Sequence, residues 1–198
     1  MSGQPETHHE ESFWRKYIFS TDHKIIGIQY GITSLVWLFF GFTLMMIMRY
    51  QLAYPESPVP YLGFLLGEGG ILPSEMYNSL GAMHGTIMIF WAITPLLIGA
   101  FGNFVIPLQI GAPDMAFPKL NMISFWTMVL ASIVLLGSYF LPEGTAAGGW
   151  TSYPPLSSPV GGIAGEGQTL WTLALTLAGT SSMMGAINYI ITVVRLRA

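Results

Sequence analysis

The chain has no cysteine and little charge. The absence of cysteine excludes disulfide bonds, thiol nucleophiles and cysteine-ligated zinc or iron–sulfur sites. Only 9% of its residues are charged, whereas about a quarter are charged in an average soluble domain. The net charge of −3 is small and argues against nucleic acid as a partner. The hydrophobic residues, by contrast, make up 52% of the chain.

Four long stretches contain no Lys, Arg, Asp or Glu, and they run over about 25–48, 80–108, 122–141 and 170–194. A bilayer core about 30 Å thick needs about 20 helical residues, so each stretch is long enough to cross it. Helices satisfy their own backbone hydrogen bonds in lipid, which open strands do not. A soluble helix would show a polar face, and none of these stretches does. The sequence predicts an all-α integral membrane protein with four transmembrane helices.

The basic residues predict the orientation of these helices, because cytoplasmic loops carry an excess of Lys and Arg. If both termini are cytoplasmic, only Arg49 of the seven basic residues lies on the outer side. The first 24 residues are too polar for a signal peptide. We therefore expect cytoplasmic N- and C-termini, with the two long Gly- and Pro-rich segments 50–79 and 142–169 outside.

His84 lies near the outer end of the second predicted helix and is the only histidine within any of the four. An ionisable residue inside a membrane is a functional candidate by default. Its position leaves three roles open: a metal or haem ligand, a proton relay, or a hydrogen bond between helices. The next residue, Gly85, leaves room for a flat group against the helix. The other histidines lie on the opposite side, so this chain alone does not supply two histidine ligands to one haem.

Two charged residues next to the predicted helices also have alternative interpretations. Arg49 ends the first helix, and from the residues alone we favour extension of its side chain to the membrane interface. The alternative is that Arg49 pairs with an acidic or carbonyl group of a cofactor near His84. Asp114 lies in the inner loop after the second helix. It is either a solvated carboxylate, for which Lys119 is a candidate partner, or the mouth of a proton path.

Several polar residues continue inward from Asp114 into the helices. They are Asn103 in the second helix, Asn121 and Ser124 in the third, and Ser181, Asn188 and Thr192 on one face of the fourth. A polar stripe of this kind either lines water or holds helices together. The small residues Ala178, Ser182 and Ala186 form a packing ridge, which favours the second role for part of the fourth helix.

A dense set of sequence strings runs from about residue 13 to the end of the chain. The strings are FSTDHK at 19–24, GN at 102–103, IGAPDMAFP at 110–118, SFW at 124–126, GWT at 149–151, YPPL at 153–156, LAG at 177–179, SS at 181–182 and GAIN at 185–188. They resemble the large catalytic subunit of haem–copper oxidases, specifically cytochrome c oxidase subunit I. The resemblance covers about the first third of a subunit with twelve helices. It implies that residues 1–198 are the N-terminal part of the subunit I domain, and that the four helices belong to a twelve-helix bundle.

The resemblance implies a haem site at the outer end of the bundle. In it, His84 is an axial ligand of the iron of the low-spin haem, which is expected to be haem a. Arg49 contacts the formyl group of that haem, which reverses the preference drawn from the residues alone. Tyr77 lies beside the same haem, and Trp150 lies near a propionate of the second, oxygen-binding haem.

The resemblance also implies a proton path at the inner end of the bundle. Asp114 corresponds to the carboxylate at the mouth of the D proton channel. The residues that correspond to its lining are Asn103, Asn121, Ser124, Ser181, Ser182 and Asn188.

In such an enzyme oxygen is reduced to water with electrons from cytochrome c, and protons are pumped. The copper ligands and the ligand of the second haem lie in later helices, so this segment is not expected to hold the oxygen-reducing centre. The implied partners are the rest of subunit I, subunits II and III, cytochrome c and membrane lipid, in a bacterial or mitochondrial inner membrane. The alternatives are a quinol oxidase of the same fold, or a non-catalytic membrane module for packing or assembly.

Overall fold

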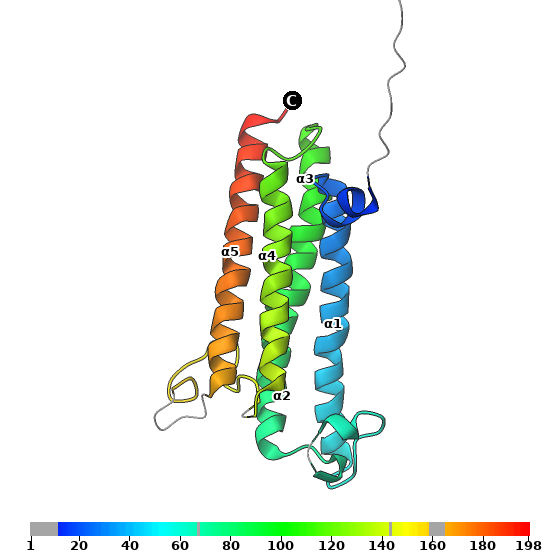
Figure 1. Cartoon of the computed structure of the whole chain (residues 1–198), viewed down its shortest axis with the longest axis vertical. Coiled ribbons are helices and arrows are strands. Elements are labelled where there is room, and N and C mark those ends of the chain that lie inside the picture. Colours follow the sequence, from blue (N-terminus) through cyan, green and yellow to red (C-terminus); the bar gives the residue numbers. More distant parts are fainter. Residues whose placement is uncertain (1–11, 67, 143, 159–164) are drawn as a thin grey trace, which may run out of the picture.

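The chain forms an antiparallel bundle of long helices (Figure 1). The computed structural model describes residues 12–66, 68–142, 144–158 and 165–198. Its long elements are α1 (His23–Ala53), α2 (Ser74–Ile87), α3 (Gly102–Ile110), α4 (Pro118–Gly137) and α5 (Glu166–Arg195). The short ones are π-helical turns at Trp14–Ile18, Met88–Ile93 and Pro95–Phe101, and 3₁₀ turns at Gly63–Leu65, Glu68–Gly70 and Ser138–Phe140. The described residues contain no strand.

In the part of the chain that the structure describes, four helical spans are long and apolar enough to cross a membrane: His23–Ala53, Ser74–Ile110, Pro118–Phe140 and Glu166–Arg195. The predicted all-α fold with four membrane-spanning helices is therefore confirmed. Each span includes one of the charge-free stretches of the sequence, except that the third ends one residue earlier, at Phe140. Large apolar side chains such as Phe39 and Val36 point outward and are 72% and 62% exposed. Such a surface suits lipid or further protein in the membrane.

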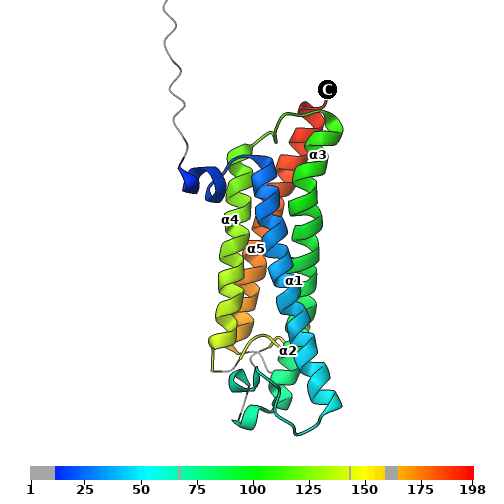
Figure 2. The same cartoon turned by 90° about the vertical axis from the view of Figure 1, so that its right-hand side faces the viewer.

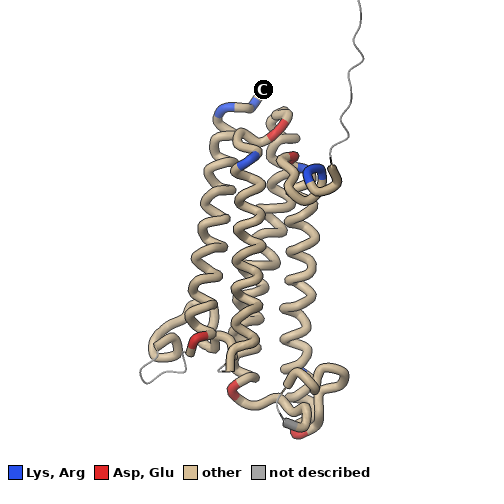
Figure 3. The backbone as a smooth tube through the Cα atoms, viewed as in Figure 1, with Lys and Arg blue, Asp and Glu red and all other residues tan. Residues whose placement is uncertain are grey.

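Both ends of the bundle follow from the local sequence. We call the end where α1 begins and α5 ends the near end, and the opposite end the far end (Figure 2). At the near end, the Asp22 side chain accepts hydrogen bonds from the backbone nitrogens of Lys24 and Ile25, at 2.7 and 3.2 Å, and so caps α1. Gly111 ends α3 with a left-handed φ of 71°. Figure 3 shows most of the blue Lys and Arg positions gathered at the near end.

The second span is one continuous helical unit from Ser74 to Ile110. Pro95 has no backbone N–H to donate. The span passes this point with two π-helical segments, Met88–Ile93 and Pro95–Phe101, between α2 and α3. π-Helical turns inside α-helices frequently occur at functional sites.

Close packing of α1 against this second span depends on glycine. A Cβ built on Gly99 would lie 2.6 Å from Cδ1 of Tyr30, so the ring of Tyr30 occupies the space of a side chain. A Cβ on Gly41 would lie 2.9 Å from Sδ of Met88. The fully buried Trp91 and Ile26 belong to the same core. On the other side of the bundle α4 packs against α5.

Candidate functional site

His84 lies on α2, about three turns from the far end of the second span. Its Nδ1 is 2.8 Å from the backbone oxygen of Gly41 on α1. A carbonyl oxygen only accepts hydrogen bonds, so Nδ1 carries the proton and Nε2 keeps its lone pair. Within the described residues no hydrogen bond is recorded to Nε2. Metal-ligating histidines usually have such a bond, in which the second ring nitrogen donates to a carbonyl or carboxylate.

The helix face next to His84 is covered by an aromatic side chain. The adjacent Gly85 has no side chain, and a Cβ built on it would lie 3.9 Å from Cδ1 of Trp150. Trp150 also lies near Phe90, with ring centroids 6.3 Å apart. Trp150 is thus an aromatic side chain over the helix face next to His84, and it is 52% exposed. A neutral imidazole nitrogen such as Nε2 of His84 is a donor of the kind that binds haem iron.

Two further predicted haem residues lie on the same pair of helices. Tyr77 lies on α2, two turns before His84, and packs half-buried against the core. Arg49 lies within α1 rather than at its end, because α1 continues to Ala53. Arg49 is exposed, and the described residues offer it no recorded ion pair or hydrogen bond. The structure brings neither side chain into recorded contact with His84, and their haem contacts remain predictions.

The loop that carries Trp150 is held to α5 by side-chain hydrogen bonds. Gln168 Nε2 donates to Ser152 Oγ at 2.7 Å, and Ser152 has a left-handed φ of 52°. The hydroxyls of Ser138 and Thr145 are 2.6 Å apart at the start of the loop, and both are buried. The position of Trp150 is therefore fixed by ordered neighbours on both sides.

Asn103 is the centre of a second polar group, toward the near end, and is completely buried. Its Nδ2 donates to the carbonyl of Gly99 at 2.6 Å and to Oη of Tyr189 on α5 at 3.1 Å. Its Oδ1 accepts from Nδ2 of Asn121 on α4 at 2.6 Å. Its backbone oxygen accepts from Nδ1 of His23 on α1 at 2.7 Å. All four spans therefore meet at this one residue.

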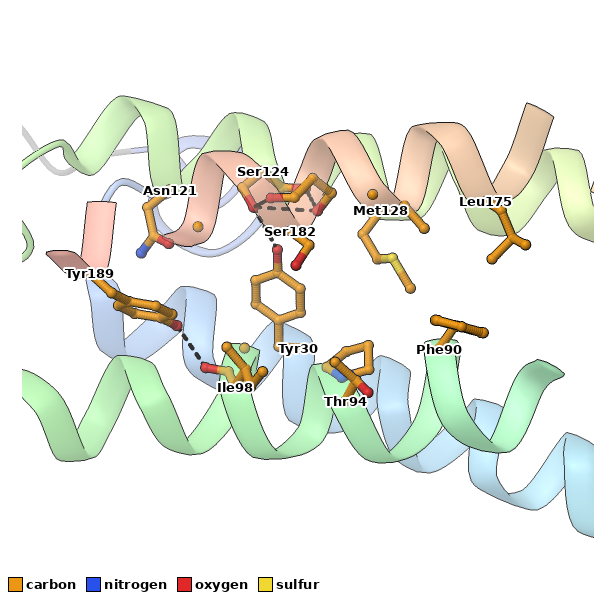
Figure 4. A pocket seen from close by; sticks show the side chains of 16 residues that line it. Tyr30, Phe90, Thr94, Ile98, Asn121, Ser124, Met128, Leu175, Ser182 and Tyr189 are labelled. Atoms are coloured by element: carbon orange, nitrogen blue, oxygen red, sulfur yellow. Dashed lines mark hydrogen bonds between the residues drawn. The ribbon is translucent and has the colours of Figure 1, made fainter. Parts of the chain in front are cut away.

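Ser124 and Ser181 join α4 to α5 by reciprocal hydrogen bonds. Ser124 Oγ donates to the backbone oxygen of Ser181 at 2.8 Å, and Ser181 Oγ donates to that of Ser124 at 2.6 Å. The hydroxyl of Tyr30 is 3.0 Å from Ser124 Oγ. Because the Ser124 proton is already donated, Tyr30 is the donor in this contact. Figure 4 shows Tyr30 reaching across from α1 to Ser124.

Asn188 and Thr192 hold the loop between α3 and α4. Asn188 Oδ1 accepts from the backbone nitrogen of Phe117 at 2.8 Å, and its Nδ2 donates to the Phe117 oxygen at 3.3 Å. Thr192 Oγ1 accepts from the backbone nitrogen of Ala116 at 2.9 Å. Both side chains are fully buried. The polar stripe on α5 thus holds a loop in place at these two positions.

Asp114 lies at the near end in this same loop and is half-buried. Its Oδ1 accepts from the backbone nitrogen of Met115 at 2.6 Å. No ion pair with Lys119 is recorded among the described residues. The loop that Asn188 and Thr192 hold therefore positions the carboxylate at the near end of the bundle.

A cavity of about 270 Å³ opens between the second span, α4 and α5. Figure 4 shows Tyr30, Ser182 and Thr94 around it, with apolar side chains toward the far end. Its polar lining includes Asn121, Ser124, Ser181 and Tyr189. The structure therefore brings four of the predicted path residues, including Ser182, to one cavity, whereas Asp114 and Asn188 lie outside its lining.

Sequence reasoning missed two tyrosines that complete this cavity. Tyr30 and Tyr189 both line it and both bond to predicted residues. Each lies in a charge-free stretch, and a buried phenol needs a hydrogen-bond partner. Their position in predicted membrane helices could therefore have marked them as members of a polar cluster. In the described parts of the chain no group of three or more His, Asp or Glu side chains is arranged to hold a metal ion.

Comparison with known proteins gives a consistent result. Residues 25–198 match the family model described as cytochrome C and quinol oxidase polypeptide I. The chain is 44% identical to a cytochrome c oxidase subunit 1 of Synechocystis sp., over 96% of this chain and 31% of that protein. It is 42% identical to one of Thermostichus vulcanus, over 93% and 30%. An alternative cytochrome c oxidase subunit 1 of Bradyrhizobium diazoefficiens is 37% identical, over 97% and 31%. The chain thus spans about three-tenths of the length of these relatives.

Proposed function

Because this chain belongs to the cytochrome c and quinol oxidase polypeptide I family, we propose that it forms the N-terminal part of the catalytic subunit of a terminal respiratory oxidase. The complete protein would reduce oxygen to water with electrons from cytochrome c and couple this reaction to proton pumping. The observation that carries the proposal is the geometry of His84, whose Nδ1 is bonded to a backbone carbonyl and whose Nε2 has no hydrogen bond to any of the described residues.

His84 is proposed to bind the iron of a low-spin haem through Nε2. The haem, when bound, supplies one-electron transfer at a potential that its axial ligands help to set. Gly41 keeps the imidazole in the tautomer that can ligate, through the bond from Nδ1. Trp150 and Tyr77 would pack beside the bound group, and Arg49 would approach its polar edge. The assignment of haem a, and of a second haem and copper in the complete subunit, belongs to the same proposal.

The near end is proposed to take up protons. Asp114 collects them in its loop, which Asn188 and Thr192 hold in place. The buried amides of Asn103 and Asn121 come next. Water in the cavity beyond them would pass protons along the hydroxyls that line it, which belong to Tyr30, Ser124, Ser181 and Ser182. A cavity with several polar partners can hold ordered water.

The orientation and the partners follow from the same assignment. The near end carries most of the basic residues (Figure 3) and is proposed to face the cytoplasm of a bacterial cell, or the matrix of a mitochondrion. The protein is then a multi-pass component of the inner membrane. The proposed partners are the rest of subunit I, subunits II and III, cytochrome c and membrane lipid.

A spectrum of the purified complete oxidase tests the haem assignment. We expect His84→Ala to remove the low-spin haem from the reduced-minus-oxidised spectrum. His23→Ala is the matched control, because His23 also donates from Nδ1 to a carbonyl but lies at the near end. An unchanged spectrum in His84→Ala would refute the assignment and would favour a non-catalytic membrane module.

A second substitution tests the proton path separately. We expect Asp114→Asn to slow proton uptake and turnover while the haem spectrum stays intact. Asp22→Asn is the matched control, because it removes the same charge at the near end and asparagine still caps α1. Normal proton pumping in Asp114→Asn would contradict the path.

The family description also includes quinol oxidases. The relatives named above are described as cytochrome c oxidase subunit 1, and this favours cytochrome c as the donor. Turnover of the purified complex with reduced cytochrome c, compared with turnover with a quinol, distinguishes the two.

A further inference from the structure

The residues before α1 form a short element with an unusual exposed face. Residues 13–19, which we call the foot, include the helical turn Trp14–Ile18. Figure 2 shows the foot turned away from the axis of α1, at the level of the near end of the bundle. The foot therefore lies where the headgroups of a surrounding bilayer would be, rather than within the hydrocarbon.

The foot is fixed to the bundle by its last residues. Gln29 Nε2 donates to the backbone oxygens of Tyr17 and Ile18, at 2.7 and 2.9 Å. Trp126 Nε1 donates to the Ile18 oxygen at 3.3 Å. The ring of Phe19 stacks on that of Trp126, with centroids 4.9 Å apart. These contacts to α1 and α4 orient the foot and leave its earlier residues free to face outward.

The outward face combines aromatic rings with positive charge. Phe13, Trp14 and Tyr17 are 63%, 64% and 44% exposed. Arg15 and Lys16 are exposed between them, and Lys16 Nζ lies 5.3 Å from the centre of the Tyr17 ring. Aromatic rings that are exposed together with Lys and Arg are typical of segments that lie in the membrane interface.

The positive charge of the foot has no acidic partner among the described residues. Asp22 is the only acidic residue described between 12 and 24, and its carboxylate is used to cap α1. A shallow groove between Thr21 and the start of α4 is lined by Lys119 as well. Lys119 is the one basic side chain in the lining of this groove.

We propose that the foot binds the headgroups of anionic phospholipids in the leaflet at the near end. Arg15 and Lys16 contact the lipid phosphates, and the three exposed rings lie at the boundary between headgroups and acyl chains. Each basic residue near an anionic membrane contributes about fivefold in affinity at low salt. This site is separate from the haem and proton-path proposals and stands if either of them fails.

The test uses the complete oxidase in lipid nanodiscs that contain equal amounts of phosphatidylglycerol and phosphatidylcholine. Lipids retained after detergent extraction are counted by mass spectrometry. We expect the double variant Arg15→Gln/Lys16→Gln to lose about 25-fold in affinity for phosphatidylglycerol at low salt, from two charges. Retention of phosphatidylcholine should not change.

Arg195→Gln/Arg197→Gln is the matched control, because it removes the same charge from the near end but at the end of α5. It should retain phosphatidylglycerol at the foot. Equal losses in the two variants, or no loss in the first, overturn the proposal. Loss of another subunit with unchanged lipid would show that the foot binds protein, and would also overturn it.

Salt provides a second test on the unmodified oxidase. Retention of phosphatidylglycerol should fall as salt is raised, because exposed charges are screened. Retention that does not depend on salt counts against the site.

Discussion

Gly41 controls how closely α1 approaches the helix that carries His84. A Cβ at this position would lie 2.9 Å from Sδ of Met88 and 3.1 Å from Cγ2 of Ile87. Ile87 is fully buried and has no free space into which to move. Atoms of this kind are stable at about 3.5 Å or more. The flexible Met88 side chain can turn aside but Ile87 cannot, so Gly41→Ala should push the two helices apart by about 0.4 Å.

The same displacement acts on the bond between Gly41 and His84. That bond is 2.8 Å long, so a shift of about 0.4 Å along it would stretch it to about 3.2 Å, the long end of the hydrogen-bond range. Overpacking costs about 1–3 kcal/mol, and alanine recovers about 0.5–1 kcal/mol of helix propensity. We expect a net loss of up to about 2.5 kcal/mol in stability and an imidazole that is held less firmly in its orientation.

Thermal denaturation and the reduced-minus-oxidised spectrum of the complete oxidase measure these two effects. We expect a lower melting temperature and a weakened or shifted low-spin haem band in Gly41→Ala. Gly31→Ala is the matched control on the same helix, because a Cβ there would meet only Cβ of Ala100, at 3.6 Å. It should be neutral or slightly stabilising. If Gly41→Ala keeps both the melting temperature and the band, the proposed coupling between helix packing and His84 is wrong.

Three other substitutions test the remaining contacts. Asn103→Leu should lower thermal stability by roughly 2 kcal/mol, because three side-chain hydrogen bonds are lost inside the membrane, and an unchanged melting temperature would contradict its central role. Thr192→Val should cost about 1–2 kcal/mol by leaving the Ala116 N–H without its acceptor, and hydrogen exchange at Ala116 should become faster. Gln168→Leu frees Ser152 but also removes a buried, unpartnered oxygen, so stability should change by less than about 1 kcal/mol. Faster exchange in residues 148–153 should accompany it, and unchanged exchange would show that Gln168 does not hold the loop.

The four membrane helices were predictable because lipid imposes a simple rule on the sequence. A spanning helix needs a long stretch without charge, and the chain has four of them. The residues at which each helix begins and ends were harder to predict. α2 begins at Ser74, with Glu75 in its first turn. A carboxylate there is favourable at the positive end of the helix dipole, so the absence of charge is a poor guide to where a helix begins.

The candidate site was predictable only in part. His84 was recognisable as an ionisable residue inside the membrane, but its partner Gly41 is 43 residues away along the chain and has no side chain that could mark it. The stripe of Asn188 and Thr192 was recognisable from helical spacing. Spacing did not show that their partners are backbone groups of the α3–α4 loop, because that depends on the path of the loop.

The side of the bundle on which the cavity opens suggests how the four helices meet the rest of the proposed subunit. Polar groups in hydrocarbon are stable only when they have partners or face water. Asn103 and Asn188 have protein partners in the described structure, whereas Ser182 is exposed at the cavity and has no recorded one there. Lipid cannot supply a hydrogen bond to this hydroxyl, but further protein or enclosed water can. The face between the second span and α5 is therefore where we expect the remaining helices to pack, and their arrival would enclose the proposed proton path.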